Sequence, residues 1–88
     1  MKMEKIFDAV KKTGFDESDI IGRNRSQPLA LIRQICIYLA KEGRTWHELS
    51  YIFKRDHANC LYAERVIKER ISINDYLTIE IMEKMGVK

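Results

Sequence analysis

The stretch "TWHELSYIFKRDHANCLYAERVIKER", from Thr45 to Arg70, decides the fold that we expect for this chain. It opens with a capping box, in which Thr45 caps a helix and Glu48 reaches back to the cap. Apolar residues then recur at helical spacing as far as Phe53. Two basic residues follow, and Asp56 can cap a second, longer helix. A short capped helix, a tight break and a longer helix are the layout of a helix-turn-helix.

The rest of the chain also has the apolar spacing of helices. Further helices are expected over residues 2–13, 16–22, 28–42 and 74–85, the third of them apolar nearly all round and therefore central and buried. One proline and four scattered glycines in 88 residues favour helices over turn-rich β structure. We therefore predict an all-α fold, a small multi-helix bundle that forms one domain over residues 1–88. Its core should include Cys60, Leu61 and Ala63 from the longer motif helix and Leu77, Ile81, Met82 and Met85 from the last one.

Composition narrows the class of protein. Apolar residues make up 45% and charged residues 33%, which is typical of a globular domain rather than a disordered tail. The amino terminus lacks the unbroken apolar core of a signal peptide, and the longest apolar region, residues 29–40, is too short to span a bilayer. Two cysteines give no disulfide framework. We therefore expect a cytoplasmic location and no membrane partner.

Positive charge is concentrated at a few places in the chain. The formal net charge is only +3, so its distribution matters more than its sum. Two arginines lie in the loop over residues 22–28, which we call the basic loop, and two basic residues lie in the break of the helix-turn-helix. The predicted central helix carries three polar residues on one face, expected to form an exposed stripe. We expect these side chains to form a surface that contacts phosphates, although each could instead be an ordinary solvated side chain. They are Arg23, Arg25, Arg33, Gln34, Lys41, Lys54 and Arg55.

Histidine and cysteine could instead indicate a metal site or a nucleophile. Cys36, His47, His57 and Cys60 match no usual zinc spacing, and both cysteines fall at predicted core positions. A catalytic pair of His57 and Cys60 would need an exposed, activated thiol. We therefore predict no metal, no cofactor and no enzymatic activity.

Three pieces of the sequence resemble one known family. They are Arg33-Gln34, then Leu39-Ala40-Lys41-Glu42, then Arg55-Asp56-His57 followed by Leu61 and Ala63. In this order and at this spacing they resemble the C-terminal DNA-binding domain of the bacterial replication initiator DnaA, from about residue 5 to residue 71.

The resemblance implies a helix-turn-helix fold akin to the Trp-repressor class and double-stranded DNA as the partner, in replication initiation or its regulation. It implies that Asp56, His57, Ala58 and Asn59 face base edges in the major groove and that Arg25 enters the minor groove. It also implies that Arg33, Gln34 and Lys41 lie at the DNA surface.

The chain departs from the family signature at several positions. Ala58 and Asn59 replace two threonines, Tyr62 replaces a histidine, and Phe53-Lys54 replaces glycines. These changes leave the target sequence open. No phosphate-loop motif occurs in the 88 residues, so no nucleotide is expected and the chain alone is not a complete initiator. A free-standing relative and an excised domain both remain open, and so does the oligomeric state, with a monomer as one option.

Two other functions remain as alternatives. The replaced threonines would suit a protein-interaction adaptor that keeps the fold but not the DNA site. The same fold could also serve a transcriptional regulator without DnaA-box specificity.

Overall fold

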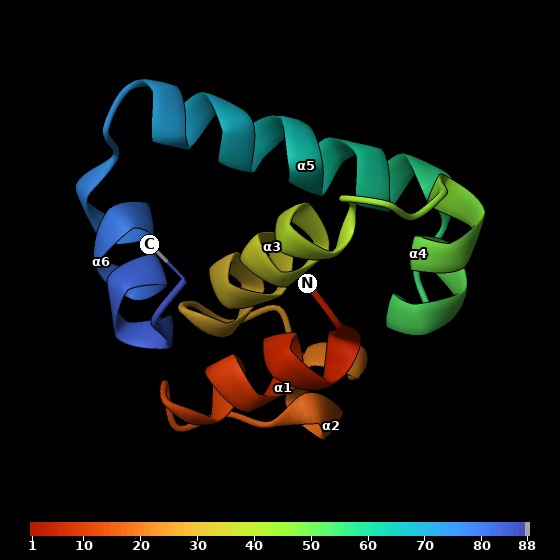
Figure 1. Cartoon of the computed structure of the whole chain (residues 1–88), viewed down its shortest axis with the longest axis horizontal. Helices are drawn as coiled ribbons and strands as arrows, with labels where there is room; N and C mark the ends of the chain where they lie inside the picture. The colour runs from red at the N-terminus through yellow and green to blue at the C-terminus, as the bar shows by residue number, and fades with distance from the viewer. Residues whose placement is uncertain (88) are drawn as a thin grey trace.

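The computed structural model describes residues 1–87 and contains six helices and no strand over that range (Figure 1). The all-α prediction is therefore confirmed. The helices are α1 (Met3–Lys11), α2 (Glu17–Ile21), α3 (Leu29–Ala40), α4 (Trp46–Phe53), α5 (His57–Ser72) and α6 (Tyr76–Met85). None of them is long and apolar enough to cross a membrane.

Helix α3 lies at the centre of the molecule. It contacts each of the other five helices. Helix α5 runs across one side of it, α1 and α2 lie on the other side, and α4 and α6 lie near the two ends of α5 (Figure 1). This position follows from the composition of α3, because eight of its twelve residues are buried and side chains on all its faces need apolar partners. The predicted central helix is thus confirmed.

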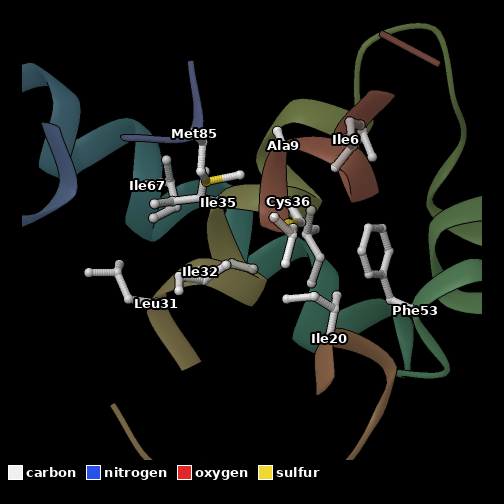
Figure 2. Close-up of a cluster of buried hydrophobic side chains, with 14 of the residues drawn as sticks. Ile6, Ala9, Ile20, Leu31, Ile32, Ile35, Cys36, Phe53, Ile67 and Met85 are labelled. Atoms are coloured by element: carbon white, nitrogen blue, oxygen red, sulfur yellow. The ribbon is translucent and has the colours of Figure 1, made fainter. Parts of the chain in front are cut away.

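The core forms where α3 meets its neighbours. Cys36 of α3 is fully buried, and side chains from α1, α2 and α4 gather around it, among them Ile6, Ile20 and Phe53 (Figure 2). The Phe53 ring also packs against the half-buried Phe7 ring, with centroids 6.4 Å apart and planes at 55°. A tilted pair of this kind adds to the stabilisation from burial. Phe53 therefore ties the end of α4 to the body of the domain.

The predicted helix caps are present. The Thr45 hydroxyl accepts from the Glu48 amide at 3.1 Å, and the Glu48 carboxylate accepts from the Thr45 amide at 3.0 Å. The hydrogen bond from the Thr45 amide, and next the Thr45 side chain, lower the pKa of the Glu48 carboxyl group. The Asp56 carboxylate accepts from the Asn59 amide at 2.8 Å. Both helices of the motif therefore begin where the sequence predicts.

Two predicted core residues are exposed instead. Leu61 is 41% exposed and Leu77 is 47% exposed. The inward line of α5 runs through Cys60, Ala63 and Ile67, which places Leu61 on the opposite face. The prediction counted Leu61 as a core residue because it is apolar, whereas α5 lies at the surface of the domain and buries only the stripe that faces its neighbours.

A polar residue occupies the inward position next to Leu77. Thr78 is fully buried, and its hydroxyl donates to the Asp75 carboxylate at 2.7 Å. The same carboxylate accepts from the Thr78 amide at 3.1 Å and caps α6. Burial of this hydroxyl therefore leaves no unpaired polar group.

Candidate nucleic-acid interface

The turn between α4 and α5 fixes the two helices of the motif relative to each other. Lys54 has a left-handed backbone conformation with φ 55° and ψ 44°. The Ser50 carbonyl accepts from the Arg55 amide at 3.2 Å, and the Ser50 hydroxyl donates to the Arg55 carbonyl. The chain therefore turns within the three residues between Phe53 and His57, and the first turn of α5 is exposed.

We expect the substitution Lys54→Gly to stabilise the fold. A left-handed conformation strains any residue that carries a Cβ atom, and glycine adopts it freely. Part of this gain is offset by the greater freedom of glycine in the unfolded chain, which leaves a net gain of about 0.5–1 kcal/mol in the free energy of unfolding. Urea denaturation measures it. Lys54→Ala serves as the control, because it removes the charge but keeps the strain; an equal gain in that variant would contradict the backbone explanation.

Arg33 was predicted to lie on an exposed stripe, and this prediction is wrong. Its exposure is 6%. Its guanidinium donates to the carbonyls of Ile20 at 2.6 Å, Asp19 at 2.8 Å and Asn24 at 2.9 Å. Because five donors in a planar fork can bond several carbonyls at once, arginine can be buried here without an acidic partner. Arg33 therefore holds the end of α2 and the start of the basic loop against α3.

Arg55 makes the corresponding connection from the helix-turn-helix. Its guanidinium donates to the carbonyls of Ile21 and Phe53 at 3.0 and 2.9 Å, and also to the carbonyl of Gly22. It therefore links the turn before α5 to the basic loop, more than thirty residues earlier in the chain. The sequence predicted a phosphate contact for this half-buried side chain, but not this internal role.

Replacement of Arg33 by alanine should destabilise the domain strongly. The change removes three charge-assisted hydrogen bonds and leaves three carbonyl groups without their partner. A cost of about 2–4 kcal/mol is therefore expected in urea denaturation. The matched control is Arg65→Ala on the exposed face of α5, which should change stability by less than about 0.5 kcal/mol. Equal stability of the two variants would show that the hydrogen bonds of Arg33 contribute nothing.

A cleft lies between the basic loop, α3 and α5, and we call it the basic cleft. It brings together residues from segments that lie far apart in the sequence. Most of the predicted DNA-binding residues line it, and so do residues that were not predicted there. Its lining includes Arg23, Arg25, Arg33, Gln34, Lys54, Arg55, Asp56, Asn59 and Tyr62.

The charges of the basic cleft are poorly compensated. Burial lowers the pKa of Arg33, and the nearby Arg55 cation lowers it further. Burial likewise lowers the pKa of Arg55, with added repulsion from Arg23 and Arg25. Within residues 1–87, the ion pairs involve only other basic residues, Lys11, Lys68 and Arg70. An anion that enters the cleft would therefore relieve repulsion between these cations.

The other two residues of the predicted reading turn lie beside the cleft. His57 and Ala58 are exposed at the start of α5. The His57 ring meets the His47 ring of α4 edge to face, with centroids 5.9 Å apart. His47 was not predicted at this surface, because the sequence does not show which face of α4 turns toward α5. The first turn of α5 thus presents His57, Ala58 and Asn59 to solvent.

Gln34 and Lys41 do not form one stripe with Arg33. Gln34 is half-buried and lines the basic cleft. Lys41 is half-buried elsewhere, where its ammonium donates to the Arg44 carbonyl at 3.0 Å and lies 4.8 Å from the centre of the Trp46 ring. The Lys41 ammonium therefore stabilises the start of α4 through a hydrogen bond and a cation–π contact.

The two cysteines are buried. Burial raises the pKa of the Cys36 thiol to about 12. Burial, and next the Asp56 carboxylate, raise the pKa of Cys60. Among residues 1–87, no three histidine, cysteine or acidic side chains come close enough together to hold a metal ion.

Both thiols should resist alkylation while the chain is folded. The thiolate is the reactive form, and raised pKa values keep both groups protonated at pH 8. Raising the pH to 9.5 should still leave the folded chain far less reactive than free cysteine. Mass spectrometry after iodoacetamide treatment checks this, with the chain in urea as the control that takes up two labels. Rapid labelling of Cys60 in the folded chain would contradict its burial.

The fold and the cleft together define a helix-turn-helix domain whose second helix has an exposed first turn beside a cationic surface. Such domains place this second helix in the major groove of DNA. The profile of the bacterial dnaA protein helix-turn-helix matches residues 3–67. The chain therefore belongs to this family of non-catalytic DNA-binding domains, and the resemblance seen in the sequence is confirmed.

Curated relatives agree with the family. The chromosomal replication initiator protein DnaA of Tropheryma whipplei (strain Twist) is 39% identical over 56 residues, which cover 61% of this chain and 12% of that protein. The protein of the same name from Streptococcus agalactiae serotype Ia is 38% identical over 72 residues, covering 77% of this chain and 16% of that protein. The matched part of the chain thus spans less than a fifth of the length of either relative.

Proposed function

We propose that this chain binds duplex DNA sequence-specifically, in the initiation of DNA replication or in its regulation. The observation that carries the proposal is the excess of cations over carboxylates around the basic cleft, directly beside the exposed first turn of α5. A cationic surface supplies the sequence-independent part of DNA affinity, and an exposed helix start supplies the part that reads bases.

The start of α5 has the chemistry of a major-groove reader. Its first exposed residues are His57, Ala58 and Asn59. An asparagine amide can bond an adenine edge through two hydrogen bonds, and a small apolar side chain can contact a thymine methyl group. The Asp56 carboxylate accepts from the Asn59 amide and lies at the rim of the cleft, where it could also accept from a cytosine amino group.

In this proposal the basic loop reaches the neighbouring minor groove. Arg23 and Arg25 are exposed and line the basic cleft. Narrow minor grooves concentrate negative potential, which attracts an inserted arginine. Arg33 and Arg55 tie the start of this loop to α3 and to the turn before α5. The loop and the reading helix would therefore meet the duplex as one rigid unit, with Gln34 and Lys54 available to phosphates.

Replication is proposed as the process because of the relatives. Those reported above are chromosomal replication initiators, although this chain matches only a small part of their length. The substitution of Ala58 and Asn59 for the two family threonines lies in the reading turn itself. A target sequence that differs from the usual DnaA box is therefore expected.

Selection from random duplexes should enrich one motif, and Arg25→Ala should weaken binding to it. We expect the variant to lose preference mainly in an A·T-rich flank, and the slope of log affinity against log salt should fall by about one. His57→Ala or Asn59→Ala should instead lose preference within the core of the motif, at a cost of about 1–3 kcal/mol per base contact.

Arg65→Ala is the matched control, since Arg65 is exposed on α5 but does not line the basic cleft. Fluorescence anisotropy at several salt concentrations measures the wild-type chain and the four variants. If selection enriches no motif, or if affinity does not depend on salt, the proposed function is ruled out. Equal losses in the Arg25 and Arg65 variants would show a general charge effect rather than a placed contact.

A further inference from the structure

The exposed face of α5 carries an apolar patch that base-edge hydrogen bonding does not use. Ala58, Leu61 and Tyr62 are spaced three and four residues apart, so their side chains are neighbours on one side of the helix. Leu61 is 41% exposed and Tyr62 is 60% exposed. This side faces away from Cys60, Ala63 and Ile67, which pack into the core.

The patch adjoins the basic cleft through Tyr62. Tyr62 lines the basic cleft together with Arg25, Lys54 and Asn59. A single exposed apolar residue is common on protein surfaces, but neighbouring apolar residues at a charged binding surface indicate a partner with matching apolar groups. The surrounding cations require that this partner be an anion as well.

One partner combines these two properties. The major groove of DNA is bordered by phosphates, and the 5-methyl group of thymine is the apolar group that its base edges present to a protein. Leu61 and Tyr62 lie in the second turn of α5, directly after the residues proposed to read base edges. A helix that enters the groove with its first turn would bring the second turn against the next bases.

We propose that Leu61 and Tyr62 read thymine methyl groups in the major groove and so determine part of the target sequence. The proposal rests on the function proposed above and names the chemical feature that is recognised. Leu61 contributes a branched aliphatic end, and Tyr62 contributes the face or edge of its ring. The Tyr62 hydroxyl needs no base partner, because it can remain in water at the edge of the groove.

Replacement of thymine by deoxyuridine tests this inference, because it removes the methyl group and leaves every base-pairing atom in place. Each thymine of the selected duplex is replaced in turn, and affinity is measured by fluorescence anisotropy. At one or two positions the wild-type chain should lose about fourfold in affinity, the value of one buried methyl group. This loss should disappear in Leu61→Ala or Tyr62→Ala and persist in Tyr62→Phe, which keeps the ring.

Tyr76→Ala is the matched control, since Tyr76 is 78% exposed on α6 and lies outside the basic cleft. This variant should keep the full loss on deoxyuridine replacement. Two results would overturn the inference and leave the proposed function intact. In the first, the chain binds DNA but deoxyuridine has no effect. In the second, the effect of deoxyuridine survives in both Leu61→Ala and Tyr62→Ala. Failure to select any duplex would overturn both.

Sedimentation of the chain without DNA tests a second copy as the occupant of the patch. A monomer is expected. Self-association that disappears in Tyr62→Ala, together with no effect of deoxyuridine, would assign the patch to that second copy and overturn the thymine assignment.

Discussion

The hydrogen bonds of the buried Arg33 guanidinium constrain the segment that forms one wall of the basic cleft. Three carbonyls at the end of α2 and in the basic loop accept from it, so a segment without regular structure is held against the most buried helix. Arg55 adds a second connection from the turn of the helix-turn-helix to the same segment. Backbone carbonyls would otherwise need water or helix partners, and a charged donor bonds them more strongly than a neutral one. The orientation of the loop relative to α5 therefore follows from two side chains.

Sequence patterns predicted the helices well because helix signals are local. Capping at Thr45 and Asp56 depends on residues within one turn, and the apolar spacing of α3 marks a central helix without knowledge of its partners. The burial of Arg33 depends on carbonyls up to fourteen residues away, whose positions only the tertiary fold determines. The exposure of Leu61 depends on how many neighbours α5 has. Periodicity shows which residues share a face, but not which face is covered.

The predicted surface residues also divide into two groups according to tertiary contacts that the sequence does not show. Arg23, Arg25, Gln34, Lys54, Asp56 and Asn59 come together around one cleft, as a shared binding surface would require. Lys41 does not, because the Trp46 ring and the Arg44 carbonyl engage its ammonium group. A basic residue in a sequence shows only that a cation is available. Whether that cation supports the fold or faces a ligand depends on which acceptors lie within reach of its side chain.

The central position of α3 also has a consequence for which residues can be exchanged without harm to the fold. Because α3 packs against all five other helices, a change of volume at any of its buried positions disturbs at least one interface and carries a cost in stability. The side chains of Ala58, Asn59 and Tyr62 project from an exposed face and can be exchanged at little cost to the fold. The domain thus separates a scaffold that resists mutation from a surface that tolerates it. Under the proposed function, single substitutions on this surface would change the DNA target without compensating changes elsewhere.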